Sequence, residues 1–415
     1  MSPTPQTHAS PTAPVAYEWE ATDEAVAARY GIPIERVARF DLNTSPTPPE
    51  LATRLLAGAE FGRSISEYPP SDYRALIAAA AARYGVGVDE ILVGAGADEI
   101  LDLIAKAFLP PGGVAVIPTP SYAMYRVNTE QRGATVRAVP RLGAAAGHAM
   151  DLPAVRAAAR GADVIWLCSP NNPTALSEPE GSIATLLDWL AVDAGAGAAG
   201  AADAGAAPAG AGAADAGAAG AAPAGAADAG APVVVLDEAY AEFTGRSLVD
   251  LRLRHHNLIV VRTASKAYAL AGLRVGFAIA HPSLIARMAP YRPPGSVSIP
   301  SVAIVTAALA DDDILADNLE RVARERQRLT AELRAAGWSV GPSVTNFVLA
   351  DFTTPEAAAA TAEGLLARGL VPRTFGPGHP LAHCLRLTVR DTDENNRLIA
   401  AAREIASRTG TEDAR

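Results

Sequence analysis

Cysteine is scarce in this chain. Only two cysteines occur among 415 residues, Cys168 and Cys384, and they are far apart in the sequence. Neither has the spacing typical of zinc ligands, so the sequence excludes a disulfide-stapled scaffold and gives no indication of a metal site. Such cysteine usage suits a reducing compartment, and we expect a cytoplasmic protein.

Excess positive charge and long apolar runs are also missing. The chain has 35 Lys and Arg against 45 Asp and Glu, a net charge of -10. This balance offers no basic stripe for a phosphate backbone, and no strongly apolar run reaches the roughly 18 residues of a membrane span. The first residues, MSPTPQTHASPTAPVA, lack the basic and apolar regions of a secretory signal. We expect neither nucleic-acid nor membrane partners, and a disordered leader over residues 1–16.

One internal stretch lacks large apolar side chains. Residues 194–232 are almost entirely Ala, Gly, Asp and Pro, with imperfect repeats such as GAADAGAAPAG. Such a segment buries too little apolar surface to offset the entropy of ordering it, and its Gly and Pro residues interrupt the helix that alanine favours. We therefore expect a mobile surface insertion and not an added domain.

Elsewhere, short aliphatic and β-branched runs alternate with helical stretches. This alternation predicts an α/β fold with a mostly parallel sheet that helices cover on both faces. Three polar residues, Asn172, Asp237 and Ser265, fall at or just after strand ends, where open α/β sheets bind their ligands. The runs predicted as strands are residues 90–96, 113–120, 163–170, 233–240, 258–265 and 275–280.

The pattern changes after Tyr291. A helical stretch over about residues 311–336, rich in Arg and Glu, leads into TNFVLADF, GLVPRTFG and HCLRLTVR. This order is typical of a smaller α+β unit. We predict a large domain over residues 71–290 and a small domain that combines residues 17–70 and 291–410.

Lys266 stands alone among small and apolar residues in TASKAYALAGLRVG. It directly follows a predicted strand, and a lysine that forms a Schiff base needs such a setting, because desolvation lowers its pKa. Ser265 and Arg274 in the same stretch could bind a phosphate, the arginine through charge-assisted hydrogen bonds. The structural alternative is a lysine that caps a turn.

Two further stretches, VVVLDEAYAEF and CSPNNPTA, suggest a pyridine-type cofactor. Asp237 ends an aliphatic strand, where a carboxylate is costly unless it faces a cation. A protonated pyridine nitrogen would be such a cation, and the aspartate would keep the ring a good electron sink. Tyr240 and Asn172 could reach a ring hydroxyl. The alternatives are a helix N-cap for Asp237 and ordinary turn chemistry for Asn172.

The stretch VGAGADEILDLIAKAFL reads as a strand, a glycine turn and a helix with Asp98 in its first turn. The free N–H groups at such a helix start can bind phosphate, although most Gly-x-Gly pairs are only turns. Tyr122, in PTPSYAMY, could stack on an aromatic ring or simply pack.

Together and in this order, the stretches GAGADEILDLIAKAF, SPNNPT, VVVLDEAYAEF and TASKAYALAGLRVGF resemble the pyridoxal-phosphate-dependent aminotransferases of fold type I, most closely the histidinol-phosphate aminotransferase group. The resemblance covers about residues 40–400. It implies a homodimer that binds pyridoxal 5'-phosphate and transfers an amino group from histidinol phosphate to 2-oxoglutarate in histidine biosynthesis. An aromatic amino acid aminotransferase and a threonine-phosphate decarboxylase remain alternatives, and a non-catalytic binding module is a more distant one.

The resemblance also implies roles for single residues. Lys266 would hold the cofactor and carry a proton. Tyr68 would reach the phosphate of the neighbouring subunit, Arg386 and Arg373 would bind the anionic end of the substrate, and Asn43 would lie on the substrate side. The remaining implied cofactor contacts are Asp237 at the pyridine nitrogen, Tyr240 and Asn172 at the ring oxygen, Tyr122 on the ring face, and Ala97, Asp98, Ser265 and Arg274 around the phosphate.

Several positions depart from the family pattern. The stretch DLNTSPTPP keeps Asn43 but has Thr44 and Ser45 in place of the usual Glu-Asn, which leaves the identity of the amine open. Ala175 stands where glycine is usual, and Glu67 where an arginine commonly precedes the tyrosine. Asn172 and Asp237 are also 65 positions apart, and removal of the Ala/Gly tract restores a typical spacing.

Overall fold

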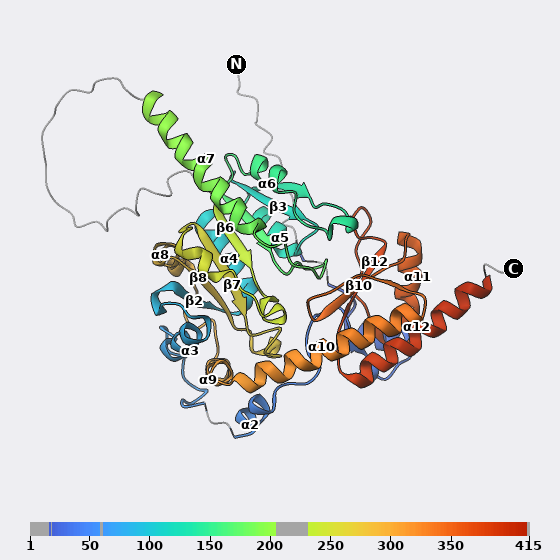
Figure 1. The fold of residues 1–415 in the computed structure, drawn as a ribbon. Helices are drawn as coiled ribbons and strands as arrows, with labels where there is room; N and C mark the ends of the chain where they lie inside the picture. Colours follow the sequence, from blue (N-terminus) through green and yellow to red (C-terminus); the bar gives the residue numbers. More distant parts are fainter. Residues whose placement is uncertain (1–15, 18, 59–60, 205–230, 413–415) are drawn as a thin grey trace, which may run out of the picture.

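The computed structural model describes residues 16–17, 19–58, 61–204 and 231–412. Figure 1 shows two units side by side, a larger one built on a seven-stranded sheet and a smaller one built on a three-stranded sheet. Helix α10 (Asp312–Ala335) runs from one unit to the other. Nearly all of the predicted leader and most of the predicted insertion lie outside the described residues.

The large sheet is mostly parallel. Its order is β2-β8-β7-β6-β5-β3-β4, and β8 alone runs antiparallel to its neighbours. The strands are β2 (Ile91–Gly94), β3 (Val114–Thr119), β4 (Thr135–Pro140), β5 (Val164–Cys168), β6 (Val233–Asp237), β7 (Leu258–Thr263) and β8 (Gly276–Ala280). The predicted fold class is confirmed, but the sequence analysis missed β4. This edge strand is mostly exposed or half-buried, so it lacks the aliphatic run of its neighbours.

Both faces of this sheet are buried, as the period-2 geometry of strands requires. In β6, Val234 and Leu236 face one apolar cluster while Val233 and Val235 face the other. The first face is covered by α3 (Arg74–Tyr84), α6 (Leu152–Ala158), α7 (Ser182–Ala204) and α9 (Ile299–Leu309). The second face is covered by α4 (Gly96–Phe108), α5 (Ala123–Gln131) and α8 (Pro282–Met288).

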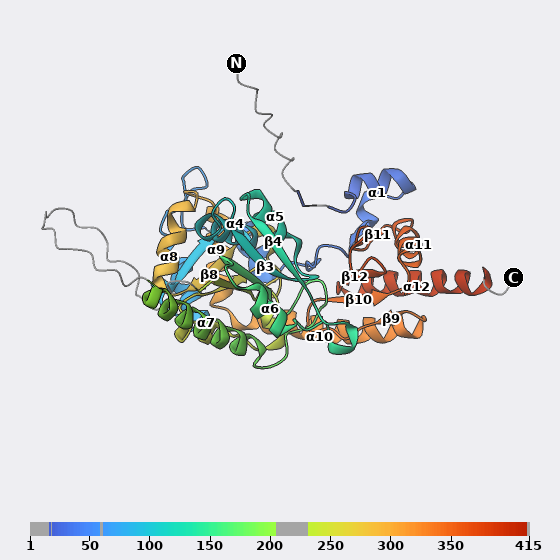
Figure 2. The same cartoon turned by 90° about the horizontal axis from the view of Figure 1, so that it is seen from above.

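The smaller unit pairs strands from both ends of the chain. Its antiparallel sheet has the order β12-β10-β9, and a second pair joins β1 to β11 in parallel. Figure 2 shows α1 (Asp23–Tyr30) beside α11 on this unit. The strands and helices are β1 (Ala38–Arg39), β9 (Ser339–Val340), β10 (Phe347–Asp351), β11 (Leu370–Val371), β12 (Cys384–Thr388), α11 (Pro355–Leu366) and α12 (Thr392–Glu412).

Helix α10 belongs to both cores. Its Leu315 packs into the core of the larger unit, whereas Val322 and Leu329 pack into that of the smaller one. Helix α9 and α2 (Glu50–Gly58) contact each other and pack on the larger core, although both lie outside residues 71–290. The predicted domain boundaries at residues 70 and 290 stay predictions.

Helix α7 continues through Ala204 and so enters the predicted insertion. We expected no regular structure from residue 194 onward, and for residues 194–204 the structure differs. This part is rich in alanine, the best helix former, and its first proline comes only at Pro208. Residues 205–230 lie outside the described residues, so a mobile loop there stays a prediction.

Short 3₁₀ helices connect the main elements, and several stand beside strand ends. The 3₁₀ segments are Ile34–Arg36, Val88–Glu90, Ala144–Ala146, Ala241–Thr244, Val249–Leu253, Ala271–Leu273 and Ala289–Tyr291.

Among the helices that the structure describes, none has both the length and the apolar character needed to cross a membrane.

Candidate active site

A cavity of about 600 Å³ lies at the carboxyl ends of β5, β6 and β7, between the two units. Segments from both units line it, which fits the general position of ligand sites in open α/β sheets. An adjoining cavity of about 560 Å³ shares part of its wall and adds Arg373. The predicted residues that line the first cavity are Asn43, Ala97, Asp98, Tyr122, Asn172, Asp237, Tyr240, Ser265, Lys266, Arg274 and Arg386.

Lys266 projects from the turn after β7. Its Nζ donates to the carbonyl oxygen of Leu42, 3.3 Å away, across the boundary between the units. Burial, aided by the positive charge of Arg386, lowers the pKa of Lys266 to about 8. A substantial fraction of this amine is therefore neutral near pH 8, and the neutral amine is the nucleophile for a carbonyl group.

Asp237 ends β6 and is 4 % exposed. Its Oδ2 accepts the hydroxyl of Tyr125 at 2.8 Å, and its Oδ1 accepts the backbone N–H of Ala239 at 3.0 Å. Burial raises the pKa of Asp237 to about 6 in spite of these two donors. A cationic group in the cavity would restore the charged carboxylate, as the sequence analysis anticipated for a protonated pyridine.

Tyr125 was not predicted as a site residue. It is fully buried, and its ring stacks on Trp166 with centroids 5.5 Å apart and planes 3° apart. It also meets Tyr122 edge-on at 5.7 Å. The available signal was the spacing in PTPSYAMY, because residues three apart on a helix lie on neighbouring positions of one face.

Glycines bring three segments together at the far end of the cavity. Gly96 at the start of α4 has a φ of +82°, and a Cβ there would lie 2.4 Å from Arg274 Nη2. A Cβ on Gly276 would lie 2.4 Å from the carbonyl carbon of Gly96. A side chain at Gly96 would strain the left-handed backbone and displace the Arg274 guanidinium, and one at Gly276 would require a backbone shift, so β8 and the start of α4 stay in close contact.

Arg274 occupies this end of the cavity. Its Nη2 donates to Asp98 Oδ2 at 3.1 Å and its Nη1 to Ser265 Oγ at 3.5 Å. Asp98 Oδ1 also accepts the hydroxyl of Tyr122 at 2.9 Å, which holds that ring at the cavity wall. The Arg274 guanidinium therefore lies beside the first turn of α4, which contains Ala97. A guanidinium and the free N–H groups of a helix start are both suited to binding a phosphate.

Arg386 lies on the opposite side, on β12, and is 7 % exposed. Its Nη1 donates to Asn172 Oδ1 at 2.6 Å and its Nη2 to the carbonyl oxygen of Asp41. Its buried Nε has no hydrogen-bond partner among the described residues. Asn172 thus contacts the arginine here, and an anion in the cavity would supply the acceptor that Nε lacks.

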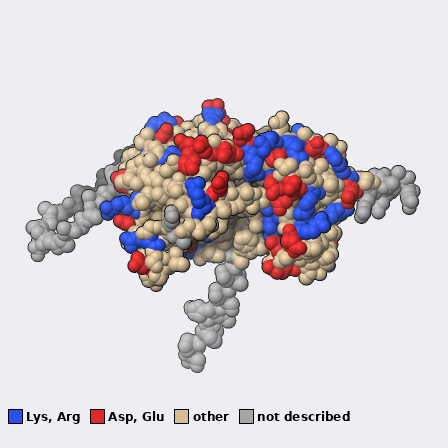
Figure 3. Space-filling model, turned by 90° about the horizontal axis from the view of Figure 1, so that it is seen from below, with Lys and Arg blue, Asp and Glu red and all other residues tan. Residues whose placement is uncertain are grey.

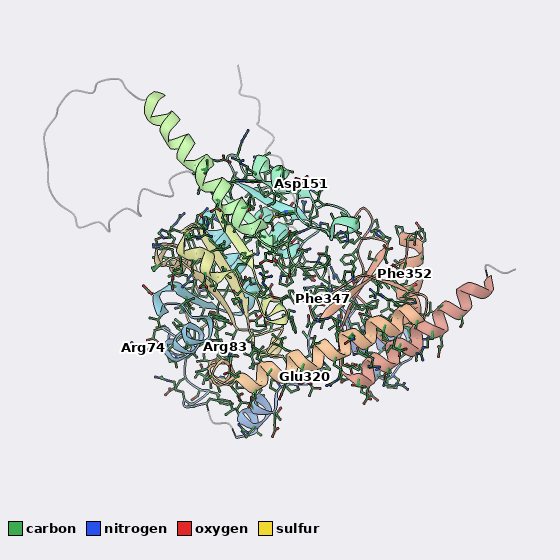
Figure 4. The ribbon with its side chains drawn as sticks, in the orientation of Figure 1. Arg74, Arg83, Asp151, Glu320, Phe347 and Phe352 are labelled. Atoms are coloured by element: carbon green, nitrogen blue, oxygen red, sulfur yellow. The ribbon has the colours of Figure 1, made fainter. Side chains whose placement is uncertain are left out.

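Tyr240 is held between the two units. Its hydroxyl accepts the amide of Asn43 at 2.9 Å, and its ring packs edge-on against Phe347 at 5.3 Å. Figure 4 shows Phe347 at the junction of the units, where β10 begins. The turn after β6 is therefore fixed by contacts from the smaller unit.

The segment just after the leader was missed as part of the site. Tyr17 and Trp19 line both cavities, and their rings meet edge-on at 4.8 Å. Arg373 lies over the Tyr17 ring at 5.3 Å and 3.7 Å from Glu20. Glu20 also accepts the backbone N–H of Thr374 at 2.8 Å, which fastens the segment down. The aromatic pair in YEW, next to a Pro-rich stretch, was the available signal.

The remaining positions singled out in the sequence differ in whether they line the cavity. Tyr68 is 89 % exposed and lines neither cavity, so its role toward a neighbouring subunit stays a prediction. Thr44 lines the cavity, and Ser45 accepts a hydrogen bond from Arg321 at 3.3 Å. Ala175 has a φ of +65°, which accounts for the glycine that is usual there.

The fold and the site together define a fold type I enzyme of the aminotransferase kind. The chain belongs to the aminotransferase class I and II family, whose model matches residues 38–192 and 227–402. The unmatched residues between these segments fall almost entirely within the predicted Ala/Gly insertion. The family resemblance found in the sequence is confirmed.

Two curated relatives are similar to this chain over most of its length. The chain is 32% identical over 393 residues to a histidinol-phosphate aminotransferase of Roseiflexus castenholzii, covering 92% of this chain and 93% of that protein. It is 33% identical over 386 residues to one of Symbiobacterium thermophilum, covering 89% and 93% respectively.

Solved structures confirm the fold. The histidinol-phosphate aminotransferase of Sinorhizobium meliloti, in complex with pyridoxal-5'-phosphate, superposes with a TM-score of 0.78 at 24% identity over 97% of this chain and 99% of that one. An L-threonine-O-3-phosphate decarboxylase from Porphyromonas gingivalis superposes with a TM-score of 0.67 at 22% identity over 88% of this chain and 98% of that one. At these identities the structures show a shared fold and do not separate substrates.

Proposed function

We propose that this chain is a pyridoxal-phosphate-dependent aminotransferase that moves an amino group from histidinol phosphate to 2-oxoglutarate in histidine biosynthesis. One observation carries the proposal. A lysine with a lowered pKa and a buried carboxylate project from adjacent strands into one cavity, opposite a buried arginine. The names of the relatives reported above support histidinol phosphate as the amino donor, and 2-oxoglutarate as the acceptor rests on the family resemblance of the sequence.

The residues present fit the cofactor. Asp237 is a buried carboxylate that a pyridinium nitrogen would stabilise, and Arg274 with the start of α4 would hold the phosphate. When bound, pyridoxal 5'-phosphate supplies the sink for the electrons left at the substrate carbon. Lys266 would hold the cofactor through its amine and would then move a proton at the substrate carbon. Tyr240 and Asn172 would orient the ring, and Tyr122 would cover its face.

The substrate side selects for a negative charge. Arg386 presents a buried guanidinium to the cavity, and Arg373 lines the adjoining cavity beside the aromatic Tyr17. A phosphate on an imidazole alcohol and the second carboxylate of 2-oxoglutarate can each be bound there. Both half-reactions therefore use one anion-binding wall.

A homodimer is the second part of the proposal. Figure 3 shows wide areas without charged side chains on the larger unit, while both signs of charge crowd the smaller one. Leu56, Ile65 and Tyr68 are large apolar residues that are 51%, 74% and 89% exposed. Apolar side chains exposed in one stretch mark an interaction surface, and a second copy would bury them. Two free cysteines, both buried, support a cytoplasmic location.

Absorbance titration of the purified protein tests the proposal. Histidinol phosphate, phenylalanine and threonine phosphate are added separately, and we expect histidinol phosphate alone to convert the lysine-bound cofactor to its amine form. Addition of 2-oxoglutarate should restore the starting spectrum. Carbon dioxide release from threonine phosphate would replace this assignment with the decarboxylase. The absence of any cofactor band, with Lys266→Ala identical to the wild type, would exclude the enzymatic function.

A further inference from the structure

Three side chains with metal-binding atoms meet at the end of the small sheet. A carboxylate oxygen of Asp351, a ring nitrogen of His383 and Cys384 Sγ all lie within 4.8 Å of one another. Asp351 and Cys384 are directly opposed in the antiparallel pairing of β10 and β12, and His383 precedes β12. No metal-ligand spacing is visible in the sequence, because Asp351 is 32 residues away from the adjacent His383 and Cys384.

The local backbone holds this cluster in place. Asp351 Oδ1 accepts the backbone N–H of Thr353 at 2.8 Å, while Oδ2 lies 3.8 Å from His383 Nε2, beyond hydrogen-bond distance. The backbone N–H of Phe352 donates to the carbonyl oxygen of His383 at 2.9 Å. Bond lengths of about 2.0–2.3 Å place ligand atoms of a tetrahedral zinc site roughly 3.5 Å apart. The half-exposed Asp351 and His383 side chains need to move only by about 1 Å to reach this spacing.

We propose that Asp351, His383 and Cys384 bind a divalent cation of the zinc type, with a water molecule as the fourth ligand. A thiolate and an imidazole favour zinc over magnesium or calcium, which prefer oxygen ligands. Binding replaces the proton on Cys384 Sγ, which leaves to solvent, so one carboxylate and one thiolate balance the two positive charges. The cation lies within the smaller unit, two residues along β12 from Arg386 and on the same face of the strand.

Cobalt titration tests this site, because a tetrahedral cobalt–thiolate complex absorbs in the visible range, to the red of the cofactor. The cofactor-loaded protein is freed of metal with a chelator and desalted to remove unbound cofactor, and Co²⁺ is then added. We expect one cobalt per chain, displaced by Zn²⁺. Cys384→Ser and His383→Asn should each weaken binding by more than about 100-fold.

Matched controls keep the result specific. Cys168→Ser removes the other cysteine and His256→Asn removes an exposed histidine, and both should retain the cobalt bands. Circular dichroism melts establish that each variant is folded; if Cys384→Ser does not fold, His383→Asn decides. The proposal is overturned if the wild type shows no intense visible bands, or if those bands persist unchanged in Cys384→Ser or His383→Asn.

Discussion

The two walls of the active-site cavity are assembled in different ways. On the cofactor wall, Asp237, Ser265 and Lys266 stand at or just beyond the carboxyl ends of adjacent strands, so the local strand and turn structure places them. On the substrate wall, Tyr17, Asn172 and Arg386 come from distant segments of both units. The proposed chemistry thus rests mainly on one unit, whereas the proposed substrate choice depends on how the two units pack together.

The largest effect is expected from Lys266→Ala, which should abolish transfer for every substrate. Loss of a positioned proton-transfer group alone costs about 10²–10⁴-fold in rate, and the covalent attachment is lost as well. Turnover and the lysine-bound absorption band should both disappear while the circular dichroism spectrum is unchanged. Retention of turnover would show that the cofactor wall does not carry the chemistry.

Arg386→Ala should act mainly on the substrate wall. Removal of one partner from a buried charge pair costs about 2–5 kcal/mol, so kcat/KM should fall for histidinol phosphate and for 2-oxoglutarate alike. The lysine-bound absorption band should still form. A change in the spectrum without a change in kcat/KM would contradict the division between the two walls.

Asp237→Asn should destroy activity yet stabilise the cofactor-free protein. The pKa of Asp237 is raised by burial from 3.8 to about 6, so folding binds protons and stability falls as pH rises between these values. Above pH 6 the folded wild type bears the full cost of the buried charge, at most about 3 kcal/mol. Urea unfolding at pH 8 should show the variant to be more stable, and the difference should vanish below about pH 4. A less stable variant at pH 8 would refute the burial argument.

The pKa of Lys266 sets the pH dependence of cofactor uptake. Only the neutral amine reacts, and this pKa is lowered by burial to about 8. Reconstitution of the stripped protein should therefore accelerate about tenfold per pH unit below pH 8 and level off above it. Stopped-flow absorbance measures this rate. A midpoint near the ordinary lysine value would show that the amine is not desolvated.

The smallest effect is expected from Tyr125→Phe, which removes a donor to Asp237. A hydrogen bond to a charged group contributes about 1.5–3 kcal/mol, and part of this should appear as weaker cofactor binding. Tyr84→Phe is the matched control, because the buried hydroxyl of Tyr84 has no partner among the described residues. Fluorescence titration with pyridoxal phosphate should distinguish the two variants, and equal affinities would remove Tyr125 from the cofactor wall.

Much of the fold and of the cofactor wall could be predicted from local pattern. Aliphatic runs that are buried on both faces located six strands of the large sheet, and the polar residues that follow them marked the site. The edge strand β4 was not predicted, because most of its side chains are exposed or half-buried and it therefore lacks an aliphatic run. Likewise, Tyr125 has the pattern of an ordinary core residue, since its hydroxyl contacts Asp237 only when α5 packs against the sheet.

The sequence by itself determined the α/β class and the aminotransferase family and proposed the residues of the cofactor wall, because each of these depends on side chains within a single strand, turn or helix start. Only the tertiary structure decided that Tyr17 and Trp19 line the cavity, that Arg386 holds Asn172, and that Asp351 meets His383 and Cys384. These contacts join residues far apart in the chain, so they exist only after the chain has folded, and the contacts in the cavity also need the two units to pack against each other.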